Sequence, residues 1–296
     1  MFSQRYVISP EFDGVTIKEF LKGLGYSTRQ IIRIKKDVDS IRLNGEHVFV
    51  IKPLKVGDVL EIKLSDVQKP TDGCDVPVPI IYEDNDVIVF NKPHSMACQV
   101  SKLHPHSTLQ NCFAHLCKTR GENMTFRCLT RLDRDTSGLT LVAKNQLAAA
   151  VLSGKSEKVY YAIVSGKTEP FGTIDAPIGI ENEWEVVRKI LPNGQRAVTH
   201  YETLCTNDEY SFIRLTLETG RTHQIRVHMS HIGHALLGDE LYGSNHDVIS
   251  RQALHCGEMS FKSVSSGEVI KVSALLSEDM QKALEKVGLN CNYLTK

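Results

Sequence analysis

The pattern of apolar and polar residues changes within the first quarter of the chain. Residues 15–24 (VTIKEFLKGL) carry apolar positions at helical spacing, and Ser27 is a good N-cap for a second helix over STRQIIRIKK. The runs IRLNGEHVFV and VGDVLEIKL then alternate, and the Asn44-Gly45 pair in the first run predicts a hairpin. Two helices followed by a small sheet predict one compact αα-β unit over residues 1–68.

Residues 69–77 (KPTDGCDVP) are rich in Pro, Asp and Gly, which is typical of a linker. Beyond them, apolar runs predict strands at DVIVFNKP, LTLVAKN, KVYYAIVSG, FIRLTLETG and THQIRVHM, and AAAVLSG predicts a helical piece. The runs follow no regular βαβ alternation, and no glycine-rich loop follows a strand, which argues against a nucleotide-binding fold. We therefore expect a second, strand-rich domain over residues 78–296.

Composition and charge leave the partner open. The chain of 296 residues has 35 basic and 35 acidic residues, so its net charge gives no global signal of a nucleic-acid partner. Arg29, Arg33 and Lys36 nevertheless fall at i, i+4 and i+7 of the second predicted helix and share one face. That face is either a solvated surface or a phosphate contact.

The cysteines and the chain start indicate the compartment. The eight cysteines are scattered without a CxxC pair, so we expect reduced thiols in a cytoplasm. The N-terminus lacks a basic segment followed by an apolar run, and no apolar stretch approaches the ~20 residues of a membrane helix. We expect a soluble, cytoplasmic protein with no membrane partner.

Three segments carry the candidate chemistry: TRLDRDTSG at 130–138, KVYYAIVSG at 158–166 and LETGRTHQIRVH at 217–228. Together they resemble the three signature motifs of the RluA-type pseudouridine synthases. The resemblance extends over most of residues 78–262 and includes YEDNDVIVFNKP, GTIDAPIG, GQRAVTHY, HIGHALLGDELYG and RQALHC. Residues 1–68 resemble, less closely, the small alpha-L RNA-binding domain that many of these enzymes carry.

The resemblance implies a fold, a reaction and a substrate class. The fold is α+β, with a mixed, largely antiparallel sheet flanked by helices and loops. In the reaction, uracil leaves its carbon–nitrogen glycosidic bond, turns, and is rejoined through ring carbon 5, which needs neither metal nor organic cofactor. We expect a monomer acting on structured RNA, with ribosomal RNA favoured over transfer RNA.

The resemblance also assigns the catalytic residues. Asp133, in the RLD tripeptide, is the essential carboxylate, acting either as a nucleophile or as a base on the ribose. Arg226, in the QIR of the third motif, is its partner, and a neighbouring Arg lowers the pKa of a carboxylate in a closed pocket. Tyr160 stacks on the uracil, while Tyr161 points to the opposite face of its strand.

Further residues are assigned to RNA binding and to the turn. Arg131 occupies the space that a flipped uridine vacates and contacts phosphate. We expect further RNA contacts from Lys92 and from Arg29, Arg33 and Lys36 of the N-terminal unit. The small and polar residues after Asp133 are expected to turn the chain and satisfy local backbone groups: Asp135, Thr136, Ser137 and Gly138.

A metal site is a first alternative interpretation. His223, His228, His231 and His234 fall within twelve residues and invite such a site, but Arg221 lies just before them and Arg226 among them, and both would repel a cation.

A second alternative is an RNA-binding protein of the same fold that has lost catalysis. Thr130 replaces the family's His, KPHSMACQVS replaces a glycine-containing segment, and the region between Gln146 and Lys158 looks shortened. Because Asp133, Tyr160 and Arg226 are all present, we favour the active enzyme.

Overall fold

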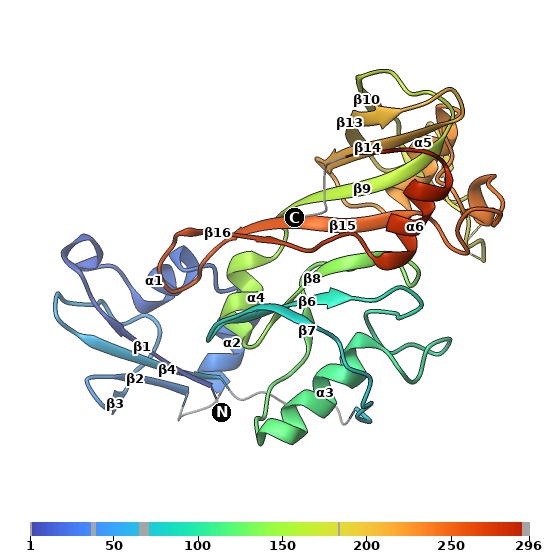
Figure 1. The fold of residues 1–296 in the computed structure, drawn as a ribbon. Helices are drawn as coiled ribbons and strands as arrows, with labels where there is room; N and C mark the ends of the chain where they lie inside the picture. The colour runs from blue at the N-terminus through green and yellow to red at the C-terminus, as the bar shows by residue number, and fades with distance from the viewer. Residues whose placement is uncertain (1, 37–39, 65–70, 183, 292–296) are drawn as a thin grey trace.

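The computed structural model describes residues 2–36, 40–64, 71–182 and 184–291. It contains a small four-stranded sheet and a large ten-stranded sheet, with helices packed beside them, so the expected α+β class is confirmed. Figure 1 shows the small sheet at one end of the molecule and β10, β13 and β14 at the other. No helix among these described residues is long and apolar enough to cross a membrane.

The N-terminal unit has the predicted order of two helices and then a sheet, with one extra strand at its start. Its elements are β1 (Phe2–Val7), η1 (Pro10–Phe12), α1 (Ile17–Gly23), α2 (Thr28–Lys36), β2 (Ile41–Leu43), β3 (Glu46–His47) and β4 (Val59–Leu64). A capping box between Thr16 and Glu19 starts α1. Asn44 and Gly45 both have positive φ, which is the backbone that a tight hairpin between β2 and β3 requires.

The N-terminal unit contacts the large domain directly. Leu147, on α4 (Gln146–Leu152), is buried in the same apolar cluster as Ile17 and Leu60. The Gln30 side-chain amide also donates to the carbonyl of Gln146 at 3.2 Å. These contacts mean that the unit packs on α4, beside α2 in Figure 1.

The predicted linker is only partly described, because residues 65–70 lie outside the described ranges. The remainder lies against α3 (Leu109–Arg120). The Asn111 amide donates to the carbonyl of Asp72 at 2.7 Å, and the Gln110 amide donates to the Thr71 hydroxyl at 3.2 Å. The described part of the linker is therefore held on a helix, and the expected boundary between residues 68 and 69 lies outside the described residues.

The large sheet positions the motifs. Its main path is β10-β13-β14-β9-β15-β8-β6-β5, with β16 beside β15 and β7 beside β8. These strands are β5 (Ile80–Glu83), β6 (Val87–Lys92), β7 (Arg127–Cys128), β8 (Ser137–Ala143), β9 (Glu157–Ser165), β10 (Phe171–Asp175), β13 (Val198–Thr206), β14 (Tyr210–Leu217), β15 (Leu254–Lys262) and β16 (Val269–Ser273). All pairings in it are antiparallel except β15 with β8. Every residue of β8 is buried.

Smaller elements complete the large domain. A separate hairpin pairs β11 (Ile178–Gly179) with β12 (Lys189–Ile190), and η3 (Glu240–Tyr242) follows α5 (Gln224–His231). The last helix is α6 (Glu278–Lys286).

The strand predicted at THQIRVHM is wrong, because residues 224–231 form the helix α5. The alternation of Ile225, Val227 and Met229 with polar residues suggested one buried and one exposed face. In the structure Arg226 and His228 are buried as well, and both have polar partners. In this segment, the polar or apolar character of a residue therefore does not indicate whether its side chain is exposed.

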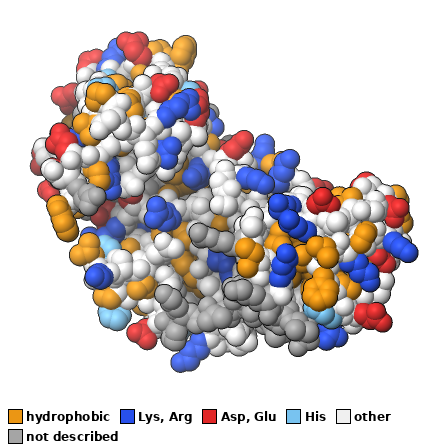
Figure 2. Space-filling model, turned by 180° about the vertical axis from the view of Figure 1, so that it is seen from behind, with side chains coloured by type: hydrophobic (Ala, Val, Ile, Leu, Met, Phe, Trp, Pro, Cys, Tyr) orange, Lys and Arg blue, Asp and Glu red, His pale blue; other side chains and the backbone are white. Residues whose placement is uncertain are grey.

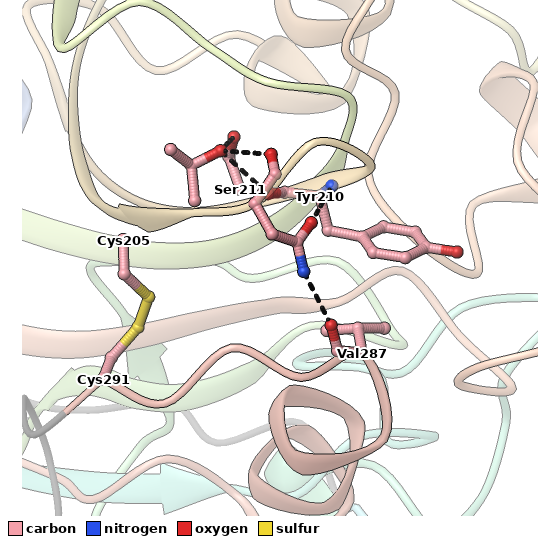
Figure 3. The surroundings of a disulfide bond; sticks show 7 residues. Cys205, Tyr210, Ser211, Val287 and Cys291 are labelled. Atoms are coloured by element: carbon pink, nitrogen blue, oxygen red, sulfur yellow. Dashed lines mark hydrogen bonds between the residues drawn. A yellow bond between two sulfur atoms is a disulfide. The ribbon is translucent and has the colours of Figure 1, made fainter.

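The expectation that all thiols are reduced is also wrong. Cys205 and Cys291 form a disulfide with a Cα–Cα distance of 6.1 Å, which is within the usual range. Figure 3 shows the bond beside a hydrogen bond of 2.9 Å from the Asn207 amide to the carbonyl of Val287. Both contacts attach the segment after α6 to the hairpin between β13 and β14.

Candidate active site

Asp133 lies in the loop before β8, at the wall of a cavity of about 550 Å³. The amide of Thr136 donates to the carbonyl of Asp133 at 3.1 Å, which closes a tight turn. The Asp133 side chain is 29% exposed and faces the cavity together with Arg131 and Tyr160. The carboxylate can therefore reach a substrate while its main chain is held.

The residues after Asp133 are fixed by contacts with the segment before β15. Arg251 donates to the carbonyl of Asp135 at 3.0 Å, and the Gln252 amide donates to the hydroxyl of Thr136 at 3.3 Å. Gly138 has φ +112°, and a Cβ atom there would lie 2.2 Å from the carbonyl oxygen of Cys256. Only glycine fits this close approach between β8 and β15.

Arg226, on α5, lies between two carboxylates. Its Nη1 is 3.5 Å from Oδ2 of Asp133, and its Nε and Nη2 both donate to Asp239 at 2.7 Å. The guanidinium carbon also lies 4.9 Å from the ring centre of Tyr242. Burial alone would lower the pKa of Arg226, but the hydrogen bonds and charge of Asp239, with the charge of Asp133, raise it. The cation is therefore fixed in charge and in orientation.

His223 is a further neighbour of Asp133. It has φ +57°, its Nδ1 is 2.9 Å from the Tyr242 hydroxyl, and its Nε2 is 3.9 Å from Oδ2 of Asp133. The pKa of His223 is lowered overall, because burial and the charge of Arg226 outweigh the charge of Asp133, which raises it. The ring is therefore neutral near pH 7. A neutral ring leaves Arg226 as the cation next to the Asp133 carboxylate.

Asp239, Tyr242 and His223 were missed as site residues by the sequence reasoning. Asp239 and Tyr242 lie in HIGHALLGDELYG, a segment that carries the family resemblance but suggested no role for either residue. The one local signal was an acidic residue between Gly238 and a short turn, which is also common in ordinary loops. His223 was considered only as a metal ligand.

Tyr160 lies on β9, which is separated by β15 from β8 and the Asp133 loop. It is 6% exposed and lines the same cavity as Asp133, while Tyr161 packs in a different apolar cluster on the opposite face. This opposition was predicted. Burial raises the pKa of Tyr160 well above its usual value, so its hydroxyl stays protonated.

The RNA-binding candidates are placed differently from one another. Arg131 is exposed at the cavity wall, as its expected role requires. Lys92 is fully buried, and its ammonium donates to the carbonyls of Pro93, Met96 and Arg134. The structure thus contradicts the prediction that Lys92 contacts RNA at the surface. Lys92 instead holds the main chain of the loop around the site.

The three basic residues of the N-terminal unit are described only in part. The backbone of Arg29, Arg33 and Lys36 lies in α2, as predicted, and their side chains lie outside the described part of the chain.

His228 and His234, two of the clustered histidines, have separate partners. His228 contacts the Thr199 hydroxyl and the carbonyl of Ala176, both at 2.9 Å, and His234 contacts the carbonyl of Ser165 at 2.8 Å. Within the ranges that the structure describes, no three His, Cys, Asp or Glu side chains form a group suited to a metal ion.

Comparisons with known proteins identify the family. The model for the family RNA pseudouridylate synthase matches residues 86–231. The chain is 42% identical over 279 residues to the uncharacterized RNA pseudouridine synthase YjbO of Bacillus subtilis, covering 92% of this chain and 99% of that one. This chain belongs to the RNA pseudouridine synthases. The synthase is also 32% identical over 312 residues to ribosomal large subunit pseudouridine synthase D of Haemophilus influenzae, covering 97% and 95% of the two chains.

Solved structures agree with this family. Human RNA pseudouridylate synthase domain containing 1 resembles the synthase with a TM-score of 0.57 and 28% identity, over 70% of this chain and 86% of that one. The synthase is accordingly an isomerase that converts uridine in RNA to pseudouridine.

The departure from the family motif at Thr130 is accommodated locally. Thr130 is buried, and its hydroxyl accepts the amide of Leu141 at 2.8 Å. The residue that replaces the family's His therefore anchors the Asp133 loop to β8.

Proposed function

We propose that the synthase modifies large-subunit ribosomal RNA and that Asp133 is the group that acts on the target nucleotide. The choice of RNA is supported by relatives named ribosomal large subunit pseudouridine synthase D, which match over most of this chain. The choice of residue is supported by one observation: Asp133 lies in the cavity 3.5 Å from a buried arginine that is already held by another carboxylate.

We propose a role for each group of the site. The target uridine leaves the RNA stack and enters the cavity, at a cost of a few kcal/mol that contacts with Arg131 offset. The Asp133 carboxylate acts on the ribose, as nucleophile or as base, while Arg226 lies 3.5 Å from it and orients it. Tyr160 stacks on the released uracil and retains it while it turns. Carbon 5 then bonds to the ribose and loses its proton, while ring nitrogen 1, released from the ribose, gains one.

The distribution of basic side chains on the surface supports a path for RNA. In Figure 2 the molecule is hollowed between the lobe that carries β10, β13 and β14 and the N-terminal unit, and Lys and Arg side chains gather along this hollow. Phosphate contacts of this kind give affinity and register with little sequence information. We further propose that the enzyme acts as a monomer in the cytoplasm.

The assignment of Asp133 is tested by Asp133→Asn, with Asp135→Asn as the matched control. The first variant is expected to lose product formation by on the order of 10⁴-fold or more, with melting temperature and RNA binding nearly unchanged. Asp135→Asn is expected to keep activity, because the contact of Asp135 with Arg251 uses its main-chain carbonyl. Substantial turnover by Asp133→Asn refutes the assignment.

The choice of RNA is tested by a transcriptome-wide pseudouridine map in cells with and without the gene. We expect the loss of one or more sites in large-subunit ribosomal RNA. Loss confined to transfer RNA would refute this choice and leave the reaction class intact.

A further inference from the structure

Two thiols lie on the wall of the cavity that contains Asp133. Cys98 follows β6 and Cys128 ends β7, and both line the cavity together with Asp133 and Tyr160. Cys98 is 5% exposed, and Cys128 is half-buried. Neither thiol takes part in the reaction described above.

Both sulfur atoms form hydrogen bonds with the main chain immediately before Asp133. The Cys98 sulfur lies 3.4 Å from both the amide nitrogen and the carbonyl oxygen of Leu132. The Cys128 sulfur donates to the carbonyl of Thr130 at 3.2 Å. The position of the catalytic loop therefore depends on both sulfur positions.

The two thiols also differ in acidity. The interaction with Cys128, opposed by burial and aided by the Leu132 amide and the Lys92 ammonium, lowers the pKa of Cys98 to about 7. The same interaction and burial raise the pKa of Cys128. By contrast, burial raises the pKa of Cys112, in a different cluster, to about 11. Cys98 is thus the thiol that supplies a thiolate near neutral pH.

We propose that Cys98 and Cys128 form an oxidisable dithiol that reacts with hydroperoxides entering the active-site cavity, and that the resulting disulfide inactivates the synthase. The loss of activity rests on the proposed role of Asp133, whereas the formation of the disulfide does not. Both partners are placed by the geometry: they share a wall, their sulfur atoms contact the main chain at Leu132 and Thr130, and they open onto a cavity large enough for a small oxidant.

The reaction proceeds in two steps. The Cys98 thiolate attacks the terminal oxygen of the hydroperoxide, a sulfur–oxygen bond forms, the oxygen–oxygen bond breaks, and the alkoxide or hydroxide leaves with a proton. The Cys128 sulfur then attacks the resulting sulfenic acid, a disulfide forms, and hydroxide leaves as water with the Cys128 proton. Two thiols are oxidised, and one hydroperoxide is reduced to an alcohol, or to water, with a second water released.

Formation of the disulfide changes the catalytic loop. A disulfide carries no S–H proton, so neither sulfur atom can still donate its hydrogen bond to the carbonyl of Leu132 or Thr130. Asp133 follows Leu132 directly, so its carboxylate is displaced relative to Arg226. A displacement of about 1 Å at a reacting group can cost on the order of 100-fold in rate.

The first measurement is of the bond itself. The full-length protein is treated with hydrogen peroxide, remaining thiols are alkylated, and peptides are analysed by mass spectrometry. We expect a cross-linked peptide pair joining Cys98 to Cys128, lighter by two hydrogen atoms, and slower formation of it when a uridine-containing RNA substrate is bound. The proposal is overturned if both thiols remain open to alkylation after treatment.

The second measurement compares each variant with its own untreated rate. Peroxide is expected to reduce pseudouridine formation by about 100-fold in the wild type and in Cys112→Ala, but much less in Cys98→Ser and Cys128→Ser. Dithiothreitol is expected to restore the rate, and a Cys205→Ala/Cys291→Ala variant controls for reduction of the other disulfide. A cross-link that leaves the rate unchanged overturns the proposed inactivation. If Asp133→Asn proves active, the proposed function fails while the cross-link remains a separate result.

Discussion

At the scale of single residues, Arg226 links Asp133 to a second carboxylate, Asp239. Two of its nitrogen atoms bind Asp239, and a third faces Asp133. In the proposed reaction, the pairing with Asp239 orients the cation in advance. The geometry of the guanidinium fork therefore matters as much as its charge.

Replacing Arg226 by Lys separates charge from geometry. The ammonium keeps the charge but cannot form the paired hydrogen bonds to Asp239, so we expect a folded protein whose turnover falls by about 100-fold. Asp239→Asn leaves a buried cation with less compensation and should lower the free energy of unfolding by about 3–5 kcal/mol. Single-turnover rates and denaturant midpoints measure the two effects. A near-normal rate in Arg226→Lys would show that charge alone suffices.

Tyr160 offers a test of stacking. Its ring lines the cavity, and its hydroxyl is protonated throughout the working pH range, so we expect the ring rather than the hydroxyl to act. Tyr160→Phe should bind substrate RNA almost normally, whereas Tyr160→Leu should lose about 1–3 kcal/mol of binding. Equilibrium binding to one RNA substrate compares them. Equal affinities and rates for the Phe and Leu variants would refute stacking.

Individual site residues were predictable from sequence only where a motif carried them. Asp133, Tyr160 and Arg226 were named from their motifs, and the structure brings all three to one site. Asp239 was not found, because its contact with Arg226 depends on how α5 and the following turn pack. Lys92 was misassigned, because a lysine in a loop motif looks the same in sequence whether it binds phosphate or main-chain carbonyls.

At the scale of elements, the pairing of β8 with β15 fixes the position of the Asp133 loop. The Nδ1 atom of His255 on β15 lies 2.9 Å from the Ser137 hydroxyl on β8, and the ring is buried. Burial lowers the pKa of His255 to about 4, compared with about 6.5 in an unfolded chain. Its neutral form is therefore the one that the sheet accommodates.

This shift predicts acid sensitivity. Above about pH 6.5 both states hold His255 neutral, so the stability is unaffected; as the pH falls toward 4, only the unfolded chain gains the proton. The free energy of unfolding should fall by up to about 3 kcal/mol in this window. His255→Gln should flatten the slope, and His106→Gln, at an exposed position, should not. Urea unfolding at several pH values measures it, and identical slopes in wild type and His255→Gln would contradict the prediction.

Elements with strong local signals were predicted correctly, and α5 was not. The hairpin at Asn44-Gly45 and the largely apolar run of β8 both carry their structure in a few residues. In α5, polar residues are buried because each meets a partner from a distant segment, such as Thr199 for His228. A pattern of apolar and polar residues cannot encode a partner that distant.

At the scale of the whole molecule, the N-terminal unit is expected to add affinity without choosing the uridine. Its basic residues on α2 are predicted to bind phosphate. Deleting residues 1–68 should weaken binding to large-subunit ribosomal RNA, but it would also uncover Leu147 of α4. Substitution of Arg29, Arg33 and Lys36 by Gln is therefore the sharper change.

The triple variant should bind ribosomal RNA more weakly, and the slope of its salt dependence should fall by about 0.9 for each phosphate that it no longer neutralises. The modified position should stay the same. Affinities measured across a range of salt concentrations give the slope, and a pseudouridine map gives the position. An unchanged affinity and an unchanged slope would show that this face of the N-terminal unit does not bind RNA.

The position of β15 in the large sheet has a consequence for synthesis of the protein. Asp133 precedes β8 and Tyr160 lies on β9, and these neighbouring strands of the chain are not paired with each other but are joined by β15, at residues 254–262. A growing chain that lacks these residues carries both halves of the site on separate strand edges, which are open to pairing with other chains. The site can therefore be completed only after β15 has been synthesised, late in translation. Until then, the open strand edges of the nascent chain need protection.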